Sequence, residues 1–248
     1  MKKINAIIYI INLEEAVVRK KSIEHELLKT DISFQFVSAI SKNNINTVNH
    51  NEISKYKRPL LSAEVACYLS HLKVKELFLK SGYDYAIIIE DDAQFQDNFD
   101  ELVKKVIEQY ASLSNKHRWD VLKLNSYGRK KMIEVKKIDE NHSLFGGSVG
   151  ITTLAAIWTR NGAKSFLEKT SKNGHYIINM PIDCALQKHW KYNLKIYNIA
   201  PELVKSRSFN SQIQQKKLKS YFFKRINFEM RKLLPRLYYF IKTWMLRY

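Results

Sequence analysis

Short apolar runs alternate with longer segments of helical periodicity over most of the chain. Apolar runs rich in β-branched residues are typical of strands buried on both faces, whereas apolar residues at helical spacing indicate a helix with one buried side. Residues 4–13 and 34–39 are predicted strands, and residues 14–28 between them form a predicted helix. The chain therefore opens as β-α-β, the unit from which parallel sheets are built.

The same alternation continues toward the C-terminus. A helix is predicted over 62–81, with Ser62 as its cap, and residues 41–58 and 125–150 are a polar loop and a region of weaker strands. The remaining predicted strands are 86–89, 119–124, 151–159 and 195–199, and the remaining helices are 97–110, 162–169 and 181–190. Alternating strands and helices predict the α/β fold class with a mostly parallel central sheet.

Composition excludes several classes of protein. With 248 residues, of which 45% are hydrophobic and 12% aromatic, the chain is long and apolar enough to build a real core, so it is not a disordered protein. Cys67 and Cys184 are its only cysteines, which excludes a disulfide framework. Both are expected to be buried thiols rather than metal ligands.

Positive charge is concentrated at the C-terminus. The formal net charge is +18, and residues 216–248 carry ten Lys or Arg against the single acid Glu229. Aromatic and aliphatic residues alternate with these cations, with a break near Pro235, which is typical of a basic amphipathic helix on an anionic membrane surface. A helical hairpin packed on the rest of the protein, or on a partner subunit, is the alternative. We expect one folded domain over 1–205 and a membrane-association segment over 206–248.

Targeting signals are weak. Residues 1–13 lack the long apolar core and cleavage site of a secretory signal, and no stretch has the uncharged length of a spanning helix. The expected location is the cytoplasm, peripheral on the cytoplasmic face of the inner membrane.

A carboxylate cluster, Glu90-Asp91-Asp92, directly follows the predicted strand. Ligand sites in open α/β sheets lie beyond the carboxyl ends of strands, and three acids held there require a compensating cation. Alternate residues of an extended segment share a face, so Glu90 and Asp92 are expected to bind one Mg²⁺ or Mn²⁺ ion while Asp91 faces elsewhere. Such ions complete their shell with phosphates, which indicates a nucleotide or nucleotide-sugar site. Capping of the next helix by these acids is the structural alternative.

Six segments in order give the chain a family resemblance. They are 10–13 followed by Arg19, 61–72, 89–92, 120–124, 159–164 and 181–183. With these segments the chain resembles glycosyltransferase family 25, which includes bacterial lipooligosaccharide galactosyltransferases. It departs from the family pattern at Thr152-Thr153-Leu154-Ala155-Ala156, where a Gly-Thr pair and a Tyr are usual, and at Ala66, where Gly is usual.

The resemblance implies a GT-A-type fold, a UDP-hexose donor with galactose as the expected sugar, and a lipooligosaccharide or lipopolysaccharide (LPS) acceptor. It also implies a divalent cation, Mn²⁺ or Mg²⁺, inversion at the anomeric carbon, and the family's version of the Asp-x-Asp (DXD) motif at 90–92.

Candidate roles for other residues follow from the chemistry of glycosyl transfer. A base must accept the proton of the acceptor hydroxyl, and Asp183, expected in the first turn of a helix with Pro181 at its first position, is the leading candidate. Asp120 is the alternative base. Asp91 is assigned to the ribose or sugar of the donor.

Three further residues are candidates for donor binding. Arg19 is suited to a donor phosphate because a guanidinium matches phosphate oxygens, and Asn12 is suited to the uracil edge. His71 shares a helix face with Glu64 and is placed in the donor pocket. Each also has a structural interpretation. Arg19 can be a solvated surface charge, Asn12 an amide in a loop, and His71 an imidazole packed in the core.

Two other functions stay open on sequence alone. The carboxylates and cation also suit phosphoryl transfer or phosphodiester hydrolysis, although the chain has only seven Gly and no Walker-type loop. The basic charge also suits a nucleic-acid-binding or scaffolding protein, but the chain contains no recognised nucleic-acid module, so nucleic acid is not an expected partner.

Overall fold

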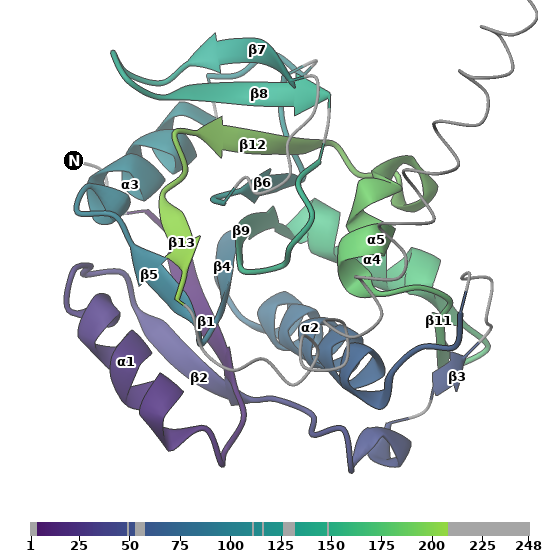
Figure 1. The fold of residues 1–248 in the computed structure, drawn as a ribbon. Helices are drawn as coiled ribbons and strands as arrows, with labels where there is room; N and C mark the ends of the chain where they lie inside the picture. Colours follow the sequence, from purple (N-terminus) through teal and green to yellow (C-terminus); the bar gives the residue numbers. More distant parts are fainter. Residues whose placement is uncertain are drawn as a thin grey trace, which may run out of the picture. The chain divides into compact units, whose positions relative to one another are not determined.

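A computed structural model describes residues 4–48, 50–52, 58–110, 112–115, 117–125, 132–147 and 149–207 (Figure 1). The basic amphipathic helix predicted over 216–248 lies outside the described residues, and only Ser206 and Arg207 of the segment 206–248 lie within them. Within the described residues, no helix combines the length and the hydrophobicity needed to cross a membrane.

An eight-stranded sheet forms the centre of the fold, in the order β2-β1-β4-β9-β6-β12-β8-β7. Its strands are β1 (Ala6–Asn12), β2 (Phe34–Ser38), β4 (Tyr85–Glu90), β6 (Val121–Lys123), β7 (Met132–Lys137), β8 (Ser143–Gly147), β9 (Ala155–Thr159) and β12 (Ile196–Ala200). The pairings give six of these eight strands one direction, and only β9 and β8 run the opposite way. The predicted α/β class is confirmed, with β9 inserted antiparallel between β4 and β6.

Helices cover both faces of the sheet (Figure 1). The helices are α1 (Val17–Leu27), α2 (Ser62–Lys80), α3 (Phe99–Tyr110), α4 (Arg160–Thr170) and α5 (Ile182–Gln187), with short 3₁₀ turns η1 (Ile45–Thr47) and η2 (His189–Tyr192). One core contains Ile87 and Ile89 of β4 with residues of α1 and α3, and the other contains Ala86 and Ile88 with residues of α2, α4 and α5. Because successive strand residues point to opposite faces, Glu90 continues the row that faces α2, α4 and α5.

Two small sheets flank the central one. Strands β10 (Ser171–Lys172), β11 (His175–Ile178) and β3 (His50–Glu52) form one, so the predicted loop 41–58 contains a short strand and a 3₁₀ turn. Strands β5 (Ala93–Phe95) and β13 (Val204–Ser206) form the other, which lies immediately after the carboxylate cluster.

The predicted elements are present, but several ends differ. Leu61, not Ser62, takes the N-cap position of α2, where the backbone is extended and the Leu61 N–H donates to Glu64 Oε2 at 3.0 Å. The strand predicted over 151–159 begins only at Ala155, and before it the Thr152 carbonyl binds Lys123 and the Thr153 hydroxyl binds Glu90. Pro181 takes the N-cap position of α5 instead of its first helical position.

The first compact unit of the chain comprises Met1–Ser208, and so ends close to the boundary expected at residue 205. Ser206 ends β13, and Arg207 pairs with Glu26 of α1, so the first residues assigned to the tail belong to the first unit.

Candidate active site

The carboxylate cluster lies where two parallel strands end together. Strands β1 and β4 pair in parallel with Ile11 opposite Glu90, which places Asn12 at the level of Asp91. The chain turns directly after Glu90, so the three acids point toward different partners.

Asp91 lies with two of the predicted donor-binding residues. Asn12 Nδ2 donates to Asp91 Oδ2 at 2.7 Å, and Arg19 Nη1 lies 3.2 Å from Asp91 Oδ1. Burial raises the pKa of Asp91, and the Arg19 charge and the Asn12 hydrogen bond offset only part of that rise. Asn12, Arg19 and Asp91 thus form one polar group, and Asp91 faces other partners than Glu90 does, as predicted.

Glu90 is held by side chains from two other elements. His71 Nε2 of α2 lies 3.2 Å from Glu90 Oε1, and Thr153 Oγ1 donates to the same oxygen. Burial alone would raise the pKa of Glu90, but His71, Thr153 and the Lys123 ammonium outweigh it and lower the pKa. Burial lowers the pKa of His71, which favours its neutral form beside the carboxylate. His71 therefore orients Glu90.

Asp92 is held by the strand that ends the first unit. Ser206 Oγ donates to Asp92 Oδ2 at 2.8 Å, and the Arg207 N–H donates to the Asp92 carbonyl at 2.8 Å. Burial, followed by the negative charge of Glu90, raises the pKa of Asp92 to about 6. The two carboxylates are therefore close enough to repel each other.

The donor chemistry of these acids fits the divalent cation that the resemblance implies. Glu90 and Asp92 offer hard carboxylate oxygens, the ligand type that Mg²⁺ and Mn²⁺ prefer. Burial and the charge of Glu90 together raise the pKa of Asp92, and a bound cation would relieve the repulsion between the two acids.

Asp183 faces the same interior as the acid cluster. It is the second residue of α5, and its charge acts on Lys123 and on Cys67, as the charge of Glu90 also does. The candidate base and the candidate cation ligand thus share their electrostatic neighbours.

Asp120 is excluded as the alternative base. Val121, the first residue of β6, is level with Trp158, and Trp158 is level with Ala86 near the start of β4. Asp120 therefore lies at the edge of the sheet opposite Glu90, where its Oδ2 accepts from the Lys195 N–H at 2.7 Å.

His71 and Glu64, predicted to share one face of the helix, have different partners, and only His71 reaches the acid cluster. Glu64 lies at the start of α2, where its Oε1 binds Arg58 Nη2 at 2.6 Å.

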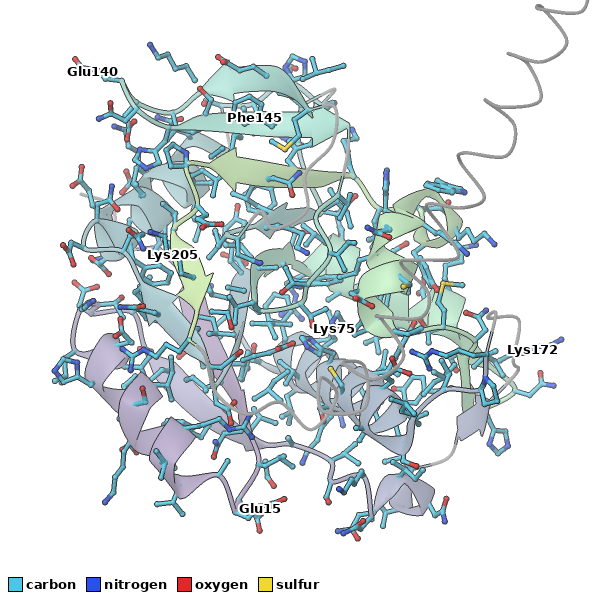
Figure 2. All side chains as sticks on the ribbon, viewed as in Figure 1. Glu15, Lys75, Glu140, Phe145, Lys172 and Lys205 are labelled. Atoms are coloured by element: carbon cyan, nitrogen blue, oxygen red, sulfur yellow. The ribbon has the colours of Figure 1, made fainter. Side chains whose placement is uncertain are left out.

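Sequence reasoning missed two buried lysines. Lys123 is fully buried in β6, and its Nζ donates to the carbonyls of Gly150, at 2.8 Å, and Thr152. Lys75 is fully buried on α2 and points into the interior (Figure 2), with Nζ 4.0 Å from the centroid of the Trp158 ring. A lysine inside an otherwise apolar strand, or on the apolar side of a helix, is the sequence signal that could have identified both.

A polar hollow of about 240 Å³ lies at the same edge of the sheet, after β1 and β2. Its lining residues are Glu14, Glu15, Ser38, Ala39, Ile40, Ser41, Asn44 and Thr47. The Ala39 N–H donates to the Asn12 carbonyl at 2.9 Å, which connects the hollow to the Asp91 group.

Comparison with known proteins identifies the family. Residues 5–186 match the profile of glycosyltransferase family 25 (LPS biosynthesis protein), and this range includes all the predicted site residues, from Asn12 to Asp183. The chain belongs to glycosyltransferase family 25. The family 25 membership confirms the sequence resemblance and favours a transferase over the phosphodiesterase and nucleic-acid-binding alternatives.

Individual relatives are distant. A "Putative glycosyltransferase" of Haemophilus influenzae is 29% identical over 210 residues, which cover 78% of this chain and 67% of that protein. A "Glycosyltransferase 25 family member" of Aedes aegypti is 24% identical over 174 residues, or 65% of this chain. The matched region spans only 28% of the length of the insect protein.

Solved structures are more distant still. The crystal structure of S. aureus TarS 1-349 is 11% identical and covers 81% of this chain and 59% of its own, with a TM-score of 0.37, too low to establish a shared fold. The GT-A-like class therefore rests on family membership and on the mixed α/β sheet itself.

Proposed function

We propose that this family 25 chain is a metal-dependent glycosyltransferase. It moves a hexose, for which galactose is the expected sugar, from a UDP-sugar to a lipooligosaccharide or LPS acceptor, with inversion at the anomeric carbon. The observation that carries the proposal is the arrangement of Glu90, Asp91 and Asp92. They end a central strand in a chain of this family, and each has a separate set of partners.

The donor is assigned to the edge of the sheet formed by β1, β2 and β4. Asn12, Arg19 and Asp91 supply an amide, a guanidinium and a carboxylate within one hydrogen-bonded group. These groups suit the hydroxyl, phosphate and base atoms of a nucleotide sugar. The adjacent hollow of about 240 Å³ offers room for part of the nucleoside.

Glu90 and Asp92 are assigned to the divalent cation, Mn²⁺ or Mg²⁺. A bound cation supplies Lewis-acid stabilisation of the negative charge on the departing UDP. The chain's own contribution is to hold the two carboxylates in place, Glu90 through His71 and Thr153 and Asp92 through Ser206.

Asp183 is assigned as the base. Its carboxylate accepts the proton of the acceptor hydroxyl as that oxygen attacks the anomeric carbon from the face opposite UDP. The negative charges of Asp183 and Glu90 both act on buried Lys123, so the base and the cation ligand are assigned to the same buried region.

The basic segment 206–248 is assigned to the membrane surface. A lipid-linked acceptor lies in the membrane plane, and an enzyme held on the cytoplasmic face meets it there. Ten Lys or Arg against one acid in residues 216–248 supply the attraction to anionic lipid.

A UDP-release assay tests the proposal. The full-length chain with Mn²⁺, UDP-galactose and a lipooligosaccharide acceptor should release UDP, and Asp92→Asn should lower that rate by about 100-fold or more, because one ligand to the developing charge is lost. Asp97→Asn is the matched control, since the Asp97 side chain is fully exposed. Asp183→Asn should lower transfer by a similar factor and Asp120→Asn should not, provided that both variants stay folded.

Full turnover by Asp92→Asn would refute the cation assignment, and full turnover by Asp183→Asn would refute the base. No turnover with any of a panel of UDP-sugars and acceptors would remove the proposed function itself.

A further inference from the structure

A second set of possible metal ligands lies beside the acid cluster. Cys67 and His71 are one helical turn apart on α2, and Glu90 faces them from the end of β4. One ligand atom from each of these side chains lies within 4.8 Å of both others, an arrangement found only for this trio among the residues that the structure describes. The acids Asp91 and Asp92 do not join it.

The donor types distinguish this set from a magnesium site. A thiolate, an imidazole and a carboxylate together favour a borderline ion such as Zn²⁺, whereas Mg²⁺ and Mn²⁺ prefer oxygen ligands alone. Binding of one Zn²⁺ would also balance charge, because the Cys67 thiolate and the Glu90 carboxylate contribute two negative charges against the two positive charges of the ion.

The spacing is close to that of a tetrahedral zinc site. With Zn–N and Zn–O bonds of about 2.0–2.1 Å, a nitrogen and an oxygen ligand lie about 3.3 Å apart. His71 Nε2 and Glu90 Oε1 are already 3.2 Å apart. A Zn–S bond of about 2.3 Å places sulfur about 3.6 Å from the other ligands, so the Cys67 sulfur needs to move by about 1 Å at most.

Thr153 lies next to the trio. Its hydroxyl donates to Glu90 Oε1 and also influences the Cys67 thiol. A hydroxyl in that place can hydrogen-bond a water on the ion. Cys67 is half-buried, and Glu90 is also only partly buried.

We propose that Cys67, His71 and Glu90 form a Zn²⁺ site with three protein ligands and one water. Binding forms a Zn–S bond as the thiol proton of Cys67 passes to solvent, a Zn–N bond as neutral His71 moves its proton from Nε2 to Nδ1, and a Zn–O bond to Glu90. Because Glu90 is also assigned to the Mn²⁺ or Mg²⁺ ion of the transferase, zinc at this site withdraws Glu90 from that role and inhibits transfer. Only this inhibitory consequence rests on the proposed function.

Cobalt spectroscopy tests the site without any measurement of catalysis. Metal-free full-length protein titrated with Co²⁺ should develop the visible bands of tetrahedral cobalt and a near-ultraviolet band of thiolate-to-cobalt charge transfer, and one equivalent of Zn²⁺ should remove both. Cys67→Ser should lose the near-ultraviolet band and bind Zn²⁺ at least about 10-fold more weakly, in line with loss of a primary ligand. Cys184→Ser removes the only other thiol and should keep the band.

X-ray absorption of the zinc-loaded wild-type chain gives an answer that does not depend on a variant folding. One sulfur at about 2.3 Å from zinc is expected. A zinc shell without sulfur, or a band lost in Cys184→Ser and kept in Cys67→Ser, would overturn the site.

The inhibitory consequence has a separate readout. Zn²⁺ should slow UDP release by the wild type and not by Cys67→Ser. If spectroscopy shows the zinc site but saturating Zn²⁺ leaves turnover unchanged, the shared role of Glu90 is wrong. If no UDP-sugar is turned over at all, the proposed function fails while the spectroscopic result on zinc still stands.

Discussion

At the scale of single residues, buried charge is the feature that sets this chain apart from an ordinary α/β core. Lys75 Nζ donates to the His71 carbonyl at 3.2 Å and lies over the rings of Trp158 and Phe166, at 4.0 and 5.2 Å from their centroids. Burial lowers the pKa of Lys75 to about 7, and the nearby Cys67 offsets this only in part. Because the buried site disfavours the charged ammonium, protonation of Lys75 lowers the stability of the folded chain.

Lys75→Met should flatten the pH dependence of stability. Burial lowers the pKa of Lys75 from 10.5 to about 7 in the folded chain. Between these two pH values, the Lys75 amine is therefore protonated in the unfolded chain and largely neutral in the folded chain. Wild-type stability should therefore rise from pH 7 toward pH 10, by up to about 1.4 kcal/mol per pH unit, and fall again as pH returns to 7. Urea unfolding at pH 7, 8 and 9 measures this slope.

The control for this prediction is Lys80→Met, which alters an exposed lysine at the end of the same helix and should keep the wild-type slope. An unchanged slope in Lys75→Met would show that Lys75 is not the titrating group.

At the scale of elements, residues 159–162 at the start of α4 connect this helix to the end of α2. Thr159 Oγ1 accepts from the Gly162 N–H at 3.1 Å and caps the helix. Arg160 Nη2 binds the Leu79 carbonyl at 2.6 Å, and its Nη1 binds the Ser81 and Tyr83 carbonyls at 2.9 Å, which ties α4 to the end of α2. This segment contributed to the family resemblance, yet it lies at the edge of the sheet opposite the acids.

Gly162→Ala should destabilise the protein. A Cβ at Gly162 would lie 2.6 Å from the Asp120 carbonyl oxygen, so α4 or the start of β6 would have to shift. Overpacking of this kind costs about 1–3 kcal/mol, measurable as a lower midpoint in urea or thermal unfolding. Gly82→Ala is the matched control, because a Cβ at Gly82 meets nothing within 4 Å. Equal midpoints for the two variants would mean that the close approach at Gly162 carries no strain.

At the scale of the whole molecule, both apolar cores and every candidate site residue belong to Met1–Ser208. The second unit, Phe209–Tyr248, carries the basic and aromatic residues that indicate membrane binding. Folding and membrane attachment are therefore expected to be separable.

Deletion of 209–248 should leave a cooperatively unfolding protein with a melting temperature within a few degrees of the full chain. The truncated protein should lose most of its binding to vesicles that contain anionic lipid, since each surface-proximal Lys or Arg contributes about 1 kcal/mol. Vesicle co-sedimentation measures this, with neutral phosphatidylcholine vesicles as the control. Equal binding of both proteins to anionic vesicles would contradict the membrane role of the tail.

The local pattern of apolar and polar residues was sufficient to predict the fold class and the position of the acids at the end of a strand. The apolar run 85–89 and the acids after it predicted both the buried strand β4 and a polar site at its end, because side-chain periodicity and strand length are local properties. Asn12, Arg19 and Asp91 were each named from the chemistry of their side chains, and the fold brings them together.

The order and direction of the strands could be known only from the tertiary structure. The antiparallel β9 between β4 and β6 sets which ends of the strands meet, and this order removed Asp120 from the site and brought Lys123 toward it. The approach of Cys67 and His71 to Glu90 likewise depends on how α2 packs against the sheet. Such contacts join residues far apart in sequence, and their energies come from packing that no local spacing encodes.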